Sequence, residues 1–145
     1  MFIITGLPRS RTAWFSAFMT ASGYTCIHEG LNNCESIAEY KEKVKLVSDA
    51  NTGYAYTGQI IDDRPTLVIH KYHHETPNEI TEKLKSLNGL HVLFDEIDER
   101  ISEIFTHLTG DKINLDIYNI FKDLNITTMA SMNQQAASIL LNETS

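Results

Sequence analysis

"FIITGLPRSRTAWFSAFM" (2–19) joins an apolar run, a short loop with two arginines and a stretch with helical spacing. The run FIIT (2–5) has the β-branched composition of a buried strand, and it ends at Gly6. After the loop, apolar side chains recur on one predicted helix face before the stop at Ser22-Gly23: Trp14, Phe15, Phe18 and Met19. The stretch therefore predicts a strand, a loop and a helix in succession.

The same alternation continues along the chain. Three more strands are predicted at YTCI (24–27), TLVIHK (66–71) and LHVLF (90–94). Helical stretches are predicted at CESIAEYKEKVKLVSDA (34–50), from Thr76-Pro77 to Asn88-Gly89, at DEIDERISEIFTHLTG (95–110), at LDIYNIFKDL (115–124) and, for a short helix, around QQAASILL (134–141). Residues 49–65 have turn chemistry and one short apolar pair, which predicts a loop or a weak edge strand. Together these elements predict one α/β domain over residues 1–145, with a parallel sheet of about four to five strands flanked by helices.

Composition excludes several functional classes. The 145 residues carry a formal net charge of −7, which argues against a general nucleic-acid binder because such proteins present a basic surface. No apolar stretch approaches the roughly 20 residues that a membrane-spanning helix needs, and no leader pattern precedes the first strand. We therefore expect a cytoplasmic protein with no membrane or nucleic-acid partner. Cys26 and Cys34 are expected to be reduced thiols.

The loop from Gly6 to Thr12 has the chemistry of an anion site. It follows the carboxyl end of a predicted parallel strand, where ligands bind in open α/β sheets, and it enters the N-terminus of a helix. Backbone N–H groups there lack intrahelical partners, and the helix dipole favours a negative charge. Arg9, Ser10, Arg11 and Thr12 add further donors. In the alternative interpretation, Ser10 only caps the helix and the arginines are solvated.

The loop does not fit a nucleotide-hydrolysing P-loop. That motif, G-x-x-x-x-G-K-[ST], needs a lysine for the phosphates and a hydroxyl for magnesium. Counting from Gly6, its last three positions are Arg11, Thr12 and Ala13, so both groups are missing. We therefore expect no metal ion.

Instead, the loop resembles the 5′-phosphosulfate-binding loop of the sulfotransferase family, P-[KR]-S-G-T-T-W. The corresponding residues are Pro8, Arg9, Ser10, Arg11, Thr12, Ala13 and Trp14. Five of these seven match, and Arg11 and Ala13 depart from the pattern. The resemblance implies a P-loop-like sulfotransferase fold in which these residues bind 3′-phosphoadenosine 5′-phosphosulfate as a co-substrate without a metal. Where the family has glycine, the Arg11 side chain must either point away or contact the phosphate with its guanidinium.

Weaker similarities extend the resemblance over roughly residues 2–110. HVLFDEIDERISEIFTHLTG (91–110) looks like a late strand–turn–helix unit of the family, and TCIHEG (25–30) puts Glu29 where bacterial carbohydrate sulfotransferases carry their proposed catalytic base. For the 3′-phosphate, Lys71 stands in place of the family's arginine, and Glu79 falls where a serine is expected. Family members are commonly much longer than this chain.

The candidate base requires a particular strand arrangement. We expect the strand at 24–27 to neighbour the strand at 2–5, because both carboxyl ends would then open into one crevice. His28 is the alternative base. A third group of residues, His70, His73 and His74, is interpreted as a solvated or phosphate-facing loop rather than a zinc site.

The sequence thus favours transfer of a sulfuryl group from a small-molecule nucleotide to an unknown acceptor hydroxyl or amine. Two other classes stay open. One is a small nucleotide kinase with a degenerate loop, and the other is a non-catalytic nucleotide-binding or interaction protein on the same fold. The acceptor and the oligomeric state cannot be read from the chain.

Overall fold

The computed structural model describes residues 1–32, 34–59, 61–72 and 74–126. It is an α/β fold with a five-stranded, all-parallel sheet in the order β2-β3-β1-β4-β5. The strands are β1 (Ile3–Gly6), β2 (Cys26–His28), β3 (Ser48–Asn51), β4 (Thr66–His70) and β5 (Leu90–Leu93). The helices are α1 (Thr12–Ala21), α2 (Ile37–Lys43), α3 (Tyr54–Thr57), α4 (Asn78–Ser86), α5 (Ile101–Thr109) and α6 (Leu115–Phe121), with a 3₁₀ turn at Phe94–Glu96. The predicted fold class is confirmed.

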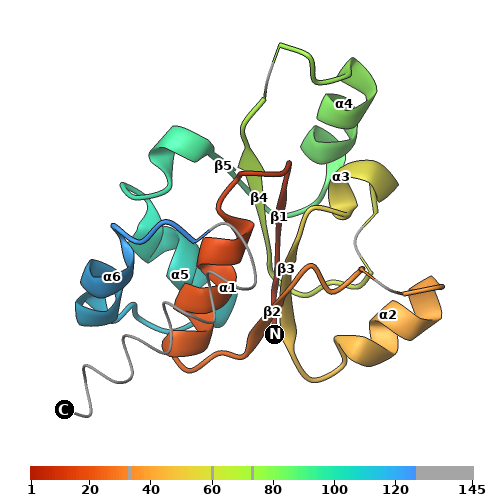
Figure 1. Cartoon of the computed structure of the whole chain (residues 1–145). Coiled ribbons are helices and arrows are strands. Elements are labelled where there is room, and N and C mark those ends of the chain that lie inside the picture. The colour runs from red at the N-terminus through yellow and green to blue at the C-terminus, as the bar shows by residue number, and fades with distance from the viewer. Residues whose placement is uncertain (33, 60, 73, 127–145) are drawn as a thin grey trace.

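The sheet separates two apolar layers. Figure 1 shows α1, α5 and α6 on one side of the strands and α2, α3 and α4 on the other. Because successive strand residues point to opposite faces, Ile4 packs with the α1 side while Ile3 packs with the α2 side. Both side chains are fully buried. The strand that leads into the arginine loop is therefore fixed by packing on both faces.

β3 corrects two predictions from the sequence. The helix predicted over 34–50 ends at Lys43, and residues 48–51 form a strand inside the sheet instead of a loop or an edge strand. The sequence SDAN has no apolar pattern, yet its polar side chains are buried, because hydrogen bonds satisfy them. For example, the Ser48 hydroxyl accepts a hydrogen bond from the Phe2 N–H at 2.9 Å. A buried polar strand gives no hydrophobic signal.

The predicted pairing of the first two strands is also wrong. β2 lies at the edge and pairs with β3, and β3 separates it from β1. The physical reason is that β3, which lies between β2 and β1, is a buried polar strand, and no apolar run in the sequence marks its place. All strands still run parallel, so their carboxyl ends share one edge. From β1 the chain crosses first to the β2–β3 side and later to the β4–β5 side, and ligands bind at such a switch point.

The later predicted elements are close to the observed ones. The helix predicted after Thr76-Pro77 is α4, and the predicted 115–124 helix is α6. The predicted 95–110 helix begins with the 3₁₀ turn, and α5 itself starts at Ile101. The short helix predicted at 134–141 lies outside the described residues.

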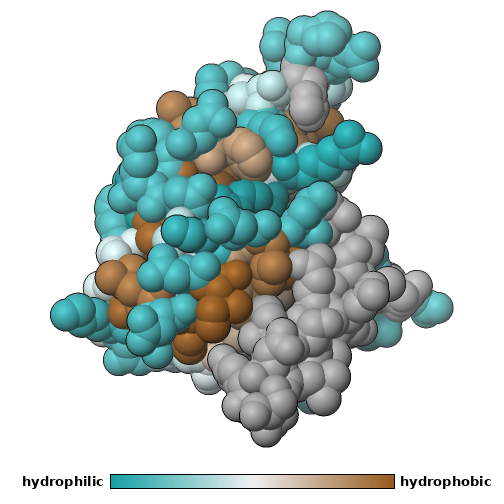
Figure 2. Space-filling model, turned by 60° about the vertical axis from the view of Figure 1, so that its left-hand side comes forward, coloured by the Kyte–Doolittle hydropathy of each residue, from teal (hydrophilic) through white to brown (hydrophobic). Residues whose placement is uncertain are grey.

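The face that carries α5 and α6 is mostly polar where it is described (Figure 2). Figure 2 turns the α5–α6 side forward and shows hydrophilic residues over most of its coloured surface, with hydrophobic residues exposed between them. α6 carries two exposed apolar side chains, Leu115 and Ile120. Within the described ranges, none of the helices has the length and apolar character that crossing a bilayer requires.

Candidate functional site

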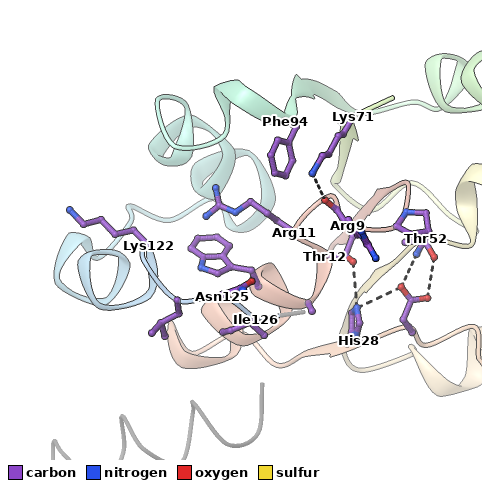
Figure 3. Close-up of a pocket in the computed structure, with 15 residues that line it drawn as sticks. Arg9, Arg11, Thr12, His28, Thr52, Lys71, Phe94, Lys122, Asn125 and Ile126 are labelled. Atoms are coloured by element: carbon purple, nitrogen blue, oxygen red, sulfur yellow. Dashed lines mark hydrogen bonds and ion pairs between the residues drawn. The ribbon is translucent and has the colours of Figure 1, made fainter. Parts of the chain in front are cut away.

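A cleft of about 690 Å³ opens at the carboxyl edge of the sheet. Figure 3 shows it running from the arginine loop toward the chain after α6. Its lining residues are Pro8, Arg9, Arg11, Thr12, Ala13, Trp14, His28, Glu29, Thr52, Lys71, Phe94, Lys122, Leu124, Asn125 and Ile126. Ten site residues were predicted from the sequence, and all of them except Ser10 line this cleft.

The cleft contains strained backbone. Arg9, Arg11 and Glu29 have φ angles of 69°, 68° and 54°, and in the described part of the chain they are the non-glycine residues with positive φ. Such left-handed conformations cost on the order of 1–3 kcal/mol each and cluster at functional sites. All three residues line the cleft. The strain is therefore concentrated where the sequence predicts a ligand.

The loop presents unsatisfied donors. Arg11 is the N-cap of α1 and makes no side-chain capping hydrogen bond, which leaves the first-turn N–H groups for an anion. Ser10 is fully buried, and its hydroxyl has no hydrogen-bond partner among the described residues. Gly6 permits this tight loop, because a Cβ there would lie 2.9 Å from the Ile69 carbonyl oxygen and 3.0 Å from the Ser10 Cβ. These features fit a bound phosphate or sulfate group.

The Arg11 side chain points away from the loop. Its guanidinium carbon lies 4.0 Å from the centroid of the Trp14 ring, and Nη1 lies 3.0 Å from Asp98 Oδ1. Asp98 also accepts a hydrogen bond from the Tyr118 hydroxyl at 2.6 Å. Of the two arrangements expected for an arginine at the family's glycine position, the chain adopts the first.

Arg9 and Lys71 supply positive charge at the loop. The Lys71 ammonium donates a hydrogen bond to the Arg9 carbonyl at 3.1 Å and lies 3.9 Å from the centroid of the Phe94 ring. The Arg9 guanidinium forms no ion pair with any residue in the described ranges. Glu79, which falls at the expected 3′-phosphate position, lies on α4 outside the cleft, where it pairs with Lys83 at 3.4 Å.

His28 and Glu29 face the loop from the end of β2. His28 Nε2 lies 3.4 Å from Thr12 Oγ1 and 3.6 Å from Glu29 Oε1. Thr52, which follows β3, donates to Glu29 through its N–H and its hydroxyl, both at 3.3 Å. Although β2 and β1 are not neighbours, His28 reaches Thr12, the first helical residue after the anion loop. Figure 3 shows Thr12, His28 and Thr52 close together.

Burial shifts the pKa of each candidate base in the direction that favours the neutral form of the side chain. It lowers the pKa of His28, partly opposed by the charge of Asp49. It raises the pKa of Glu29, with Thr52 hydrogen bonds opposing the rise and Asp49 adding to it. A neutral imidazole accepts protons at neutral pH, and a carboxylate with a raised pKa is a stronger base than an ordinary one. The pair can therefore remove a proton from a bound group.

Trp14 has a structural role that the motif does not predict. It is only 2% exposed, and its indole N–H donates to the Phe121 carbonyl at 2.7 Å. The ring stacks on Phe18 with a centroid distance of 5.0 Å. The tryptophan therefore connects α1 to the end of α6 while its edge reaches the cleft.

Some residues that line the cleft are not predicted from the sequence. Thr52 follows β3, so it was missed together with that strand, whereas Phe94 ends the predicted strand 90–94 and could have been placed at the same sheet edge. The segment after α6, with Lys122 and residues 124–126, carries no sequence signal that points to the cleft.

The histidine that ends β4 and the histidines of the loop after it do not form one cluster. His70 Nε2 lies 2.7 Å from His91 Nδ1, and His91 Nε2 lies 2.7 Å from the Leu87 carbonyl oxygen, to which it donates. His74 is exposed and lies 3.6 Å from Glu75, and His73 lies outside the described residues. Among the residues with described positions, no three metal-binding side chains group together.

Comparison with known proteins identifies no relative: no protein-family model, no curated protein and no solved structure matches the chain.

Proposed function

We propose that the protein binds 3′-phosphoadenosine 5′-phosphosulfate and transfers its sulfuryl group to an acceptor hydroxyl or amine. One observation carries this proposal. The loop that resembles a phosphosulfate-binding loop and the two candidate bases, Glu29 and His28, come from different strands and line the same cleft.

Binding would use the donors of the loop. The α1 N-terminus, the Arg9 guanidinium and the Lys71 ammonium are suited to the 5′-phosphosulfate group, because charge-assisted hydrogen bonds to phosphate oxygens are the strong ones. Arg11 is not assigned to the ligand, because its guanidinium is paired with Asp98.

Transfer would proceed by attack of the acceptor on sulfur. Glu29, or His28 beside it, takes the proton from the acceptor O–H or N–H as the acceptor atom bonds to sulfur. The bond between sulfur and the bridging phosphate oxygen breaks, and its electron pair leaves with 3′-phosphoadenosine 5′-phosphate. Arg9, Lys71 and the helix N-terminus would stabilise the negative charge that develops on this leaving group.

A ligand screen tests the proposal. Thermal unfolding is followed with adenosine 5′-phosphosulfate, 3′-phosphoadenosine 5′-phosphosulfate, 3′-phosphoadenosine 5′-phosphate and ATP, each with and without magnesium. A ligand at about 100 times its dissociation constant stabilises a protein by about 2.7 kcal/mol. We expect stabilisation by the 3′-phosphorylated nucleotides without magnesium. Stabilisation by ATP only with magnesium would support a kinase instead, and no response to any nucleotide would contradict the proposal.

A further inference from the structure

A buried carboxylate lies behind the candidate bases. Asp49, in the middle of β3, is fully buried, and both of its oxygens are engaged. Oδ1 accepts a hydrogen bond from the Gly30 N–H at 3.0 Å. Oδ2 accepts hydrogen bonds from the Tyr40 hydroxyl and the Asn51 side-chain amide, both at 2.6 Å. Burying a carboxylate costs free energy unless such donors satisfy it. These hydrogen bonds therefore hold Asp49 and its partners in one arrangement.

The network reaches the site through two loops. Gly30 directly follows Glu29, and Asn51 directly precedes Thr52, whose N–H and hydroxyl bind the Glu29 carboxylate. The Asn51 side-chain oxygen also accepts a hydrogen bond from the Gly53 N–H at 2.8 Å. Asp49 therefore fixes the backbone on both sides of the contact between Glu29 and Thr52.

The fit at Gly30 is too close for another residue. A Cβ at this position would lie 2.6 Å from Asp49 Oδ2. The Asp49–Gly30 hydrogen bond holds the peptide that follows Glu29, and Glu29 itself has a φ of 54°. A non-glycine residue keeps such a conformation only where its surroundings impose it. The Asp49 carboxylate holds the peptide after Glu29, while the Glu29 N–H donates to the Ala50 carbonyl at 2.9 Å.

We propose that Asp49 is a positioning residue, which holds Glu29 and its neighbour His28 against the anion loop through Gly30 and Asn51. This inference deepens the proposed function and rests on it for the catalytic meaning of Glu29. The geometric claim concerns only this chain. It can therefore be tested without any turnover.

The charge of Asp49 also acts on the two bases. The charged groups that face His28 are Glu29, which directly follows it and lies 3.6 Å away, Asp49 on β3, and Arg9 and Lys71, which line the same cleft. Burial lowers the pKa of His28, and the charge of Asp49 opposes this by raising it. Burial raises the pKa of Glu29, and the charge of Asp49 raises it further. Removing the negative charge should therefore lower the pKa of His28.

The experiment is an NMR titration of the His28 imidazole in three nucleotide-free proteins: wild type, Asp49→Asn and Ser48→Ala. Ser48→Ala is the matched control, because Ser48 lies in the same strand as Asp49. This change removes a buried hydrogen bond from the Phe2 N–H but none of the hydrogen bonds of Asp49. We expect a lower His28 pKa in Asp49→Asn and an unchanged one in Ser48→Ala. The positioning role itself is read from hydrogen exchange of the Thr52 amide, which donates to Glu29 and should exchange faster in Asp49→Asn than in wild type or Ser48→Ala. Unchanged exchange at Thr52 in Asp49→Asn would overturn the proposal.

A second variant covers the case in which Asp49→Asn does not fold. Asn51→Ala keeps the carboxylate but removes the link to Gly53 and one donor to Asp49. Amide hydrogen exchange is then compared at Thr52, which donates to Glu29, and at Ile3, which donates to the Pro65 carbonyl in the sheet. Faster exchange at Thr52 alone supports the positioning role. Equal acceleration at both amides, or none at Thr52, contradicts it, and neither result depends on which nucleotide the protein binds.

Discussion

The Arg11 guanidinium lies over the Trp14 ring, with its carbon 4.0 Å from the ring centroid, at the first turn of α1. The same guanidinium pairs with Asp98 beyond β5. Arg11 thereby connects the anion loop to the chain on the far side of the cleft. Its backbone has a φ of 68°, a conformation that glycine adopts without strain. The side chain and the backbone of this residue therefore have opposite effects on stability.

The first prediction separates these two effects. Arg11→Ala and Arg11→Gly both lose the contacts with Trp14 and Asp98, but only alanine keeps a side chain in the left-handed conformation. We expect the glycine variant to be the more stable of the two by about 1 kcal/mol, the scale of that steric cost. Urea unfolding of both variants measures the difference. An alanine variant as stable as the glycine variant would show that the loop does not need a positive φ at this position.

The second prediction concerns Arg9. Because its guanidinium is available for the ligand, Arg9→Ala should weaken binding of 3′-phosphoadenosine 5′-phosphate by about 1.5–3 kcal/mol, the value of a hydrogen bond to a charged group, or roughly 10- to 150-fold. Isothermal titration calorimetry measures the affinity. Arg100→Ala is the matched control, because Arg100 pairs with Glu103 on α5, at 2.9 Å and outside the cleft. Equal affinity in the two variants would make Arg9 a solvated surface residue.

The third prediction concerns pH. Burial lowers the pKa of His70 from its ordinary 6.5, and positive charge at His91 and Lys85 lowers it further. A histidine with a depressed pKa stabilises the fold above its unfolded pKa, and this contribution is lost as the pH falls, because the unfolded chain then binds the proton more readily. Between about pH 7.5 and about pH 5.5, wild type should lose more unfolding free energy than His70→Gln.

Urea unfolding at the two pH values gives this comparison. His74→Gln serves as the control, because the His74 side chain is 91% exposed. We expect this control to follow wild type. If His70→Gln instead loses as much stability as wild type on acidification, the histidine pair does not resist protonation.

The arginine loop shows how much of the site could be predicted from sequence. An apolar run before Gly6 and helical spacing after Thr12 identify the strand and helix correctly, and the loop between them reaches the cleft as expected. These patterns report burial, which is the dominant force in placing such elements. Hydrophobic patterns do not report backbone angles. Nothing in the sequence indicates that Arg9 and Arg11 both have positive φ.

β3 shows where pattern-based prediction fails. Its Asp49 and Asn51 are fully buried, but each is stabilised by hydrogen bonds to residues distant in sequence or in adjoining loops. Periodicity detects apolar burial and is blind to a buried polar strand. Because β3 gives no apolar signal, the sequence indicates neither Thr52 at the sheet edge nor the separation of β2 from β1. The candidate base was nevertheless placed at the correct edge, because all carboxyl ends of a parallel sheet lie on the same side.

Glu29→Gln gives the most direct test of the central claim, that the anion loop and Glu29 form one sulfuryl-transfer site. The amide keeps the size of the side chain but cannot take a proton, so transfer from 3′-phosphoadenosine 5′-phosphosulfate should fall about 10²- to 10⁴-fold. Affinity for 3′-phosphoadenosine 5′-phosphate should change little. The transfer rate is measured with a panel of sugar, phenol and amine acceptors, beside direct titration of the product nucleotide.

Glu82→Gln is the control for this measurement, because Glu82 lies on α4 and pairs only with Lys85, at 3.9 Å, among the described ion pairs. The account predicts that Glu82→Gln transfers at the wild-type rate while Glu29→Gln binds nucleotide but hardly transfers. Full transfer by Glu29→Gln, or no transfer by wild type to any acceptor despite tight nucleotide binding, would contradict it.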